Sequence, residues 1–170
     1  MKYIIQVIKI IDKISEITGK IASSFIIIMV ILHFQEVILR YIFQRPTTWS
    51  WEIATYLYGA NFILAGAWAL KQGRHVRTDF VFGRLSPKWQ AIVDLSTFCT
   101  IFLLFIGLIG FFAIRSAINS TVILETSYTM SPIPIWPLKI VIAYGFTILF
   151  LQGLAKITRD IIFLVKGENI

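Results

Sequence analysis

The sequence is poor in the residues on which disulfide-rich proteins, metalloproteins and most enzymes depend. Its 170 residues include one cysteine, two histidines and only 15% charged residues. The single cysteine, Cys99, has no partner for an internal disulfide and so identifies no redox compartment. Glycine-rich phosphate loops, nucleophile elbows and HExxH zinc motifs are also missing. We therefore expect that the protein is not an enzyme and has no catalytic residue, metal ligand or cofactor site.

The chain is rich in hydrophobic residues, which form long uncharged runs. Hydrophobic residues make up 57% of it and the mean hydropathy is +0.78, which is typical of a membrane protein. Four uncharged runs can anchor transmembrane helices: residues 21–35, 53–70, 95–114 and 140–155. A helix needs roughly 20 residues to cross the hydrocarbon, so flanking residues extend these runs to spans of about 20–43, 50–70, 91–114 and 136–156. The sequence predicts an all-α membrane protein: four transmembrane helices in an antiparallel, tilted bundle, forming one membrane domain over residues 1–170.

A fifth uncharged run, Thr126 to Leu138, is predicted to be a loop. It contains Pro132, Pro134 and Pro137, and three prolines within six residues cannot lie in one regular helix. The residues from Arg115 onward leave room for a short continuation of the third span before this loop.

The basic residues predict that both termini are cytoplasmic, because Lys and Arg in short loops are retained on that side. Twelve of the sixteen lie before span one, between spans two and three, or after span four. The other four flank the remaining connections: Arg40, Arg45, Arg115 and Lys139. A net charge of +7 also suits a face lying against anionic lipid. Nucleic acid is not an expected partner, because no soluble basic domain exists to bind it.

Residues 1–18 have an amphipathic pattern. Ile4, Val7, Ile8, Ile11 and Ile14 recur at three- and four-residue spacings, while lysines and acids take much of the other side. One interpretation is an N-terminal helix that lies in the cytoplasmic interface. The other is a simple extension of span one into water.

Four tryptophans fall near predicted span ends: Trp49, Trp51, Trp89 and Trp136. Indole rings favour the headgroup level, so we interpret these residues as membrane-interface anchors rather than ligand-stacking surfaces. The connection at 44–49 is short, which predicts that spans one and two form a tight antiparallel hairpin.

Three charged residues gather at the outer ends of spans one and two. Glu36 precedes Arg40 by four residues, the favourable order for an ion pair on a helix, and Glu52 opens span two. Either Arg40 is shared between the two acids, or Arg40 reaches headgroups and each acid faces water. Asn61 lies near the middle of span two, where an amide needs a partner, and we expect it to contact another helix. Candidates for subunit contact or structural pairing are therefore Glu36, Arg40, Glu52 and Asn61.

The two histidines give no convincing site. His33 in span one has no acid at its own depth, so we interpret it as a packed side chain rather than a proton carrier. His75 and Asp79 share the basic connection after span two, but two ligands are too few for a metal site. We keep His75 and Asp79 as candidates for subunit contact or structural pairing.

Three stretches together resemble the small membrane subunit, of the DctQ or SiaQ type, of tripartite ATP-independent periplasmic (TRAP) transporters. They are Arg40-Tyr41-Ile42-Phe43 through Trp49-Ser50-Trp51-Glu52, Gly66-Ala67-Trp68-Ala69-Leu70 through Gly73, His75, Val76 and Asp79, and Ser131-Pro132 through Trp136-Pro137 with Gly145 beyond. The resemblance covers most of residues 36–153. It departs from the family pattern at Ile53, where many relatives have a second acid, and in the density of prolines after Ser131.

The resemblance implies a three-part complex in the bacterial inner (cytoplasmic) membrane. Its other parts are a large multi-span permease subunit, which moves solute by a sodium-driven elevator mechanism, and a periplasmic solute-binding protein. The small subunit braces the large one among the membrane lipids, and its outer loops help dock the binding protein. The implied solutes are organic acids such as sialic acid or C4-dicarboxylates.

An alternative from another class is a self-sufficient four-helix exporter or channel, acting as a homodimer with Glu36 as its coupling acid. Glu36 lies near one end of its span and the span interiors are uncharged. These two features favour the accessory subunit.

Overall fold

The computed structural model describes residues 2–73 and 86–166, and this part of the chain is almost entirely helical. In chain order the elements are α1 (Lys2–Tyr41), α2 (Trp49–Lys71), α4 (Pro87–Thr97), the π-helix η1 (Phe98–Phe102), α5 (Leu103–Val122) and α6 (Trp136–Lys166). Four segments are long and apolar enough to cross a membrane: Tyr3–Tyr41, Trp49–Lys71, Leu95–Val122 and Trp136–Val165. The prediction of four membrane-spanning helices is confirmed.

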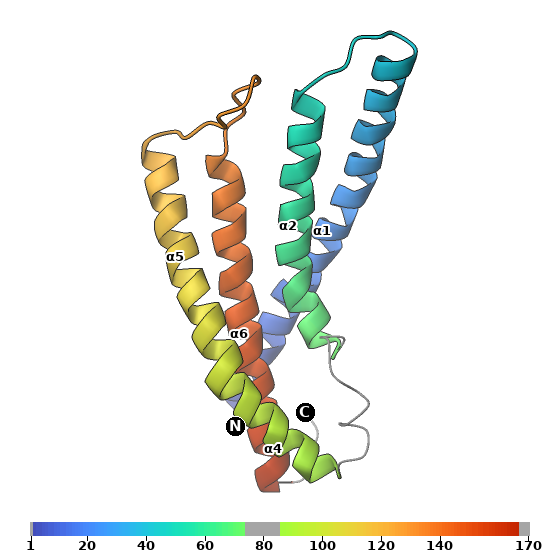
Figure 1. Ribbon diagram of the computed structural model, residues 1–170. Coiled ribbons are helices and arrows are strands. Elements are labelled where there is room, and N and C mark those ends of the chain that lie inside the picture. The colour runs from blue at the N-terminus through green and yellow to red at the C-terminus, as the bar shows by residue number, and fades with distance from the viewer. Residues whose placement is uncertain (1, 74–85, 167–170) are drawn as a thin grey trace.

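The helices form two antiparallel pairs, α1 with α2 and α5 with α6, and α2 packs on α6 to join the pairs. Figure 1 shows that the two pairs lie close together at the end holding both termini and diverge toward the opposite end. We call the first the terminal end. The second, with the connections at 42–48 and 123–135, is the hairpin end. Both termini lie at one end, as an even number of spans requires; which side of the membrane that is stays a prediction.

The amphipathic N-terminal segment is helical and runs without a break into the first span. Its buried residues, Ile8, Ser15, Thr18 and Ala22, lie along one side of α1, which contacts both α2 and α6. The structure therefore favours the interpretation of this segment as an extension of span one. Its depth relative to the bilayer interface stays a prediction.

The core is small because most apolar side chains point outward. Its buried centre consists of Ala67, Leu70, Ile148 and Leu149, where α2 meets α6. Glycines allow close approach beside it: a Cβ on Gly19 would lie 2.6 Å from the Cβ of Trp68, and one on Gly145 would lie 2.9 Å from Ile63 Cγ1. Exposed large hydrophobic residues cover all the long helices. Such a surface is suited to lipid or to another membrane protein, not to water.

The third span contains a π-helix that sequence analysis did not predict. Phe98–Phe102 interrupts the α-helical pattern between α4 and α5, and Phe98 and Phe102 pack against the core. A Cβ on Gly153 of α6 would lie 2.5 Å from the Phe102 ring. The bulge thus places an aromatic ring where only glycine leaves room for it.

Beyond this span, the predicted helical continuation is confirmed, because α5 runs to Val122. The predicted loop is confirmed only as far as Ile135, since α6 begins at Trp136 and includes Pro137 and Leu138. A proline is tolerated in the first turn of a helix, where its missing N–H costs no hydrogen bond.

Candidate functional site: polar networks at the two ends of the bundle

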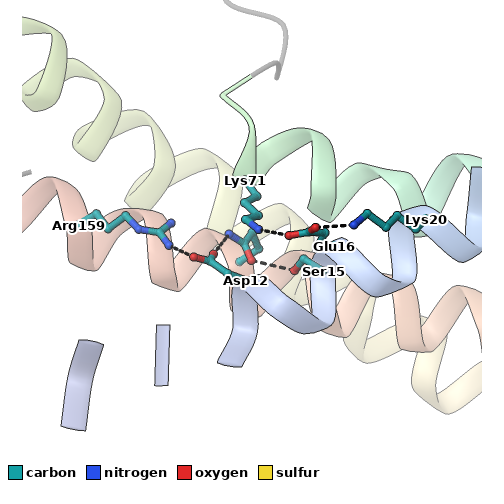
Figure 2. Close-up of polar contacts among 7 residues, drawn as sticks. Asp12, Ser15, Glu16, Lys20, Lys71 and Arg159 are labelled. Carbon is teal, nitrogen blue, oxygen red and sulfur yellow. Dashed lines mark hydrogen bonds and ion pairs between the residues drawn. The ribbon is translucent and has the colours of Figure 1, made fainter. Parts of the chain in front are cut away.

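At the terminal end, a fully buried glutamine ties α6 to α1. The Gln152 amide nitrogen donates a hydrogen bond to Asp12 Oδ1 at 2.9 Å, and its amide oxygen accepts one from Ser15 Oγ at 2.8 Å. Arg159, two helical turns along α6, donates to the other Asp12 oxygen. Figure 2 shows Asp12 and Ser15 of α1 on the side that faces α6, with Arg159 reaching toward Asp12. All the hydrogen-bonding atoms of Gln152 and Asp12 therefore serve contacts between α1 and α6.

A second acid extends the network to α2. Glu16 Oε2 accepts from Lys71 Nζ of α2 at 2.8 Å, and Glu16 Oε1 accepts from Lys20 Nζ on its own helix at 2.6 Å. The Lys71 and Glu16 side chains are about one-quarter and one-third exposed (26% and 38%). Together Asp12 and Glu16 fasten α1 to both α6 and α2 (Figure 2).

At the hairpin end, Glu36 organises the connection between α1 and α2. Its carboxylate accepts from Arg40 at 3.0 Å, from the Thr47 amide at 3.2 Å, from Thr47 Oγ1 at 2.5 Å and from Ser50 Oγ at 2.9 Å. The Glu36 side chain is only 12% exposed. The Thr48 side chain makes no capping hydrogen bond at the start of α2. Glu36 orders the turn just before this helix through Thr47 and Ser50.

Glu52 serves the other connection. Its carboxylate accepts from Tyr56 OH at 2.9 Å and from Thr129 Oγ1 at 2.7 Å, so it links α2 to the loop at 123–135. The Thr48 and Ser131 hydroxyls form a second link at 2.7 Å. Arg40 pairs with Glu36, and in the described part of the chain no ion pair joins it to Glu52. The alternative in which Arg40 is shared between the two acids is therefore wrong, because neutral hydroxyls hold Glu52 instead.

The loop at 123–135 is ordered by its own contacts. Ser127 N donates to the Ile133 carbonyl at 2.8 Å, and Ile135 N donates to the Glu125 carbonyl at 2.9 Å. The Glu125 carboxylate pairs with Lys139 at the start of α6. The Lys139 ammonium stabilises the charged carboxylate and lowers the pKa of Glu125 below its ordinary value.

The remaining candidates are spread out. Asn61 is half-buried in α2, and no hydrogen bond joins it to another described residue, so the expected contact with a second helix of this chain is not seen. His33 is exposed, and its ring lies edge-on to Trp51 with ring centroids 6.0 Å apart, so it contacts a neighbouring ring but is not buried. His75 and Asp79 lie outside the described residues. No cluster of three or more potential metal ligands occurs in residues 2–73 and 86–166.

The four tryptophans lie near helix ends. Trp49 and Trp136 open α2 and α6, Trp51 follows in the first turn of α2, and Trp89 lies near the start of α4. Trp51 and Trp89 are largely exposed. These positions suit headgroup anchoring, which stays a prediction.

Sequence analysis missed the buried glutamine network. Asp12, Ser15 and Glu16 recur at helical spacing on α1, as do Gln152, Lys156 and Arg159 on α6. Polar strips at this spacing on otherwise apolar helices are the signal that points to such a contact.

The arrangement of four long apolar helices, hairpin contacts and a proline-rich loop at 123–135 is the context in which the family comparison is read. The family model described as the DctQ component of tripartite ATP-independent periplasmic transporters matches residues 29–162. The chain belongs to the DctQ family. The match runs from the middle of α1 almost to the end of α6 and includes Glu36, Glu52 and Gln152. The comparison with curated proteins gave no match.

Membership in the DctQ family defines the coarse role of the protein. It is a small, multi-pass membrane subunit of a TRAP transporter, and the family is a transporter component rather than an enzyme family. DctQ proteins work with a large permease, DctM, and a periplasmic binding protein. Both polar networks therefore belong to a subunit that functions beside other proteins.

Proposed function

We propose that this chain is the accessory subunit of a sodium-driven TRAP transporter that imports an organic acid, such as sialic acid or a C4-dicarboxylate, across the bacterial inner membrane. In this proposal, solute and sodium bind to the partners. The DctQ-type chain stays fixed beside the large subunit, and its outer loops help dock the periplasmic binding protein.

The location of the charged side chains carries the proposal. The spans contain long uncharged interiors, at 21–35, 53–70, 95–114 and 140–155. The acids that occur in α1 and α2, Asp12, Glu16, Glu36 and Glu52, all accept hydrogen bonds within this chain at one end of the bundle or the other. A transporter acting alone needs a polar solute or ion site near the midplane. Glu36 has its oxygens committed to the hairpin, which argues against a coupling role in a self-sufficient exporter.

The two networks suit a brace. An elevator-type subunit needs a fixed scaffold that resists tilting while the transport part slides. Contacts of Asp12, Glu16 and Gln152 hold α1, α2 and α6 together at the terminal end, and a wide apolar surface keeps the bundle in lipid. At the hairpin end, Tyr128 and Met130 project from the loop at 99% and 93% exposure. Exposed apolar side chains on an ordered outer loop support a docking surface for the binding protein.

The accessory role can be tested by reconstituting this chain with the large subunit and the binding protein. The tagged chain, co-expressed with a DctM-type large subunit, is expected to retain that subunit during purification. Liposomes holding both chains, supplied with the binding protein and a sodium gradient, are expected to accumulate labelled sialic acid or succinate. Liposomes holding this chain alone should accumulate neither. Transport by this chain alone would refute the accessory role and support the homodimeric exporter.

A further inference from the structure

One exposed face of α2 differs from the exposed face of α5. Trp51, Thr55, Tyr58 and Phe62 recur at spacings of four, three and four residues and are all exposed, and Asn61 lies at their edge. We call these five residues the α2 face. The corresponding exposed residues of α5 are purely apolar: Leu104, Phe105, Leu108 and Phe112. We call those four the α5 face.

The α2 face contains an amide that lipid cannot satisfy. Asn61 lies near the centre of the 23-residue helix α2, hence near the middle of the bilayer. It is half-buried, and no hydrogen bond joins it to another residue in the described ranges. Hydrocarbon offers neither donor nor acceptor, so the amide is stabilised if a neighbouring protein supplies them. By contrast, the α5 face carries no side chain that needs such a partner.

Next to the α2 face, at the hairpin end, lies Glu52, an acid that forms no ion pair with another described residue. At the hairpin end, a hollow of 630 Å³ is lined by Trp51, Glu52, Thr55 and Thr129, among others. Glu52 is only 9% exposed, and its hydrogen-bond donors, Tyr56 and Thr129, are neutral. Arg40 also lines the hollow, but its guanidinium pairs with Glu36. Within residues 2–73 and 86–166 no ion pair neutralises Glu52, and a nearly buried carboxylate is stabilised by a close cation.

We propose that the α2 face and the hollow at Glu52 receive a transmembrane helix of the large permease subunit. That helix carries a lysine or arginine that reaches Glu52 and a hydrogen-bonding side chain opposite Asn61, while the α5 face lies against lipid. Charge complementarity at one end of the face and amide pairing at its centre fix the depth of the partner helix. The inference rests on the proposed function and adds the contact surface to it.

Photocrosslinking tests the surface with matched aromatic positions. p-Benzoylphenylalanine replaces Tyr58 or Phe62 on the α2 face and Phe105 or Phe112 on the α5 face, in the full chain co-expressed with the large subunit. All four side chains are more than half exposed (63%, 72%, 58% and 61%). We expect a crosslinked product of the two subunits from Tyr58 and Phe62, at least tenfold above the yield from the α5 positions.

The possible outcomes distinguish a wrong contact surface from a wrong proposed function. A product from the α5 positions alone would overturn the inference and leave the proposed function intact. Adducts of the α2 positions with lipid only, or with a second copy of this chain only, would also overturn it. Failure of the two subunits to co-purify at all would overturn the proposed function as well.

Two substitutions test the chemistry of the contact. Asn61→Leu and Glu52→Gln are each expected to lower the amount of large subunit retained by the tagged chain about tenfold. Glu125→Gln serves as the control, because Glu125 pairs with Lys139 inside this chain. Unchanged thermal unfolding of the isolated Asn61→Leu chain shows that the loss is one of association. Wild-type retention by both α2 variants would refute the chemistry proposed for this face.

Discussion

The two ends of the bundle are held together by different chemistry. At the terminal end, side chains of three helices contact one another directly through Asp12, Glu16 and Gln152, and three basic residues neutralise the two acids. At the hairpin end, Glu36 and Glu52 hold the connecting segments through hydroxyls and one backbone amide. The terminal end therefore fixes helix to helix, whereas the hairpin end mainly fixes the connecting segments to helices, with Ser50 to Glu36 as its direct link between α2 and α1.

This difference matches the divergence of the helix pairs in Figure 1. Where the pairs lie close, a buried glutamine and interlocking charges set their relative position. Where they separate, the 123–135 loop crosses to α2 through Thr129 and Ser131. Global stability should then depend mainly on the terminal end, and substitutions at the hairpin end should act locally.

Gln152→Leu tests this division most severely. Leucine matches the size of glutamine but leaves the buried Ser15 hydroxyl and one Asp12 oxygen without a partner. We expect the free energy of unfolding to fall by about 2–4 kcal/mol, measured by reversible denaturation in mixed detergent. Gln72→Leu, at an exposed glutamine just beyond α2, should change it by less than about 0.5 kcal/mol. Equal effects of the two variants would mean that the network does not stabilise the bundle.

Gly19→Ala tests the close approach of α1 and α2. The added methyl group would lie 2.6 Å from Trp68 Cβ, which can move only with its backbone. We expect the free energy of unfolding to fall by about 1–3 kcal/mol through overpacking. Gly59→Ala on α2 adds the same atom where nothing lies within 4 Å, and should be neutral or stabilising by up to about 1 kcal/mol. Thermal unfolding of the two variants in parallel compares them, and a lower midpoint for Gly59→Ala would contradict the packing seen here.

Glu36→Gln should act locally at the hairpin end. The amide side chain keeps the size of the carboxylate but not its charge, and it weakens the bond from the Thr47 amide. Hydrogen exchange at the Thr47 amide should accelerate about tenfold, the change expected for loss of one charge-assisted hydrogen bond. The amide of Ile133, which donates to Ser127, supplies the control and should exchange at its wild-type rate. A comparable acceleration at both amides would show that the two connections are not independent.

Sequence patterns predicted the spans because the requirement is local. Hydrocarbon excludes unpaired charge, so uncharged runs of adequate length mark the helices. The helix ends were less predictable. α6 continues to Lys166, past the predicted end of span four at about residue 156, and the charges there pair within α6, as Lys156 does with Asp160, or with α1, as Arg159 does with Asp12. A charge that ends a hydrophobic run does not end a helix.

The contacts between distant residues were beyond sequence patterns. Gln152 and Asp12 lie 140 residues apart, and which faces of α1 and α6 meet depends on the packing of the whole bundle. The pairing of Glu36 with Arg40 could be predicted from the sequence, because the two residues are one helical turn apart. The partner of Glu52 could not be predicted, because Thr129 lies in a loop whose path is set by its own turns. The π-helix depends on Phe102 fitting over Gly153, which is again a contact between helices.

The smallest expected effect is a pH dependence confined to the loop at 123–135. Lys139 lowers the pKa of Glu125 below its ordinary value of 4.5. A carboxyl whose pKa is lower in the folded state stabilises that state above the unfolded pKa, and the stabilisation is lost as the pH falls through the folded pKa. The Glu125–Lys139 pair should therefore contribute at neutral pH and cease to contribute well below pH 4.5.

Glu125→Gln removes this titration. Thermal midpoints recorded from pH 7 to pH 3 should show a smaller acid-induced decrease in the variant than in the wild type. The variant should be slightly less stable at neutral pH, and the two curves should converge in acid. Lys139→Gln should flatten the curve in the same way, and the double variant should add nothing further, because one pair is responsible. Parallel curves for wild type and Glu125→Gln would assign the acid sensitivity to the other acids, and Glu36 at the hairpin would be the next to replace.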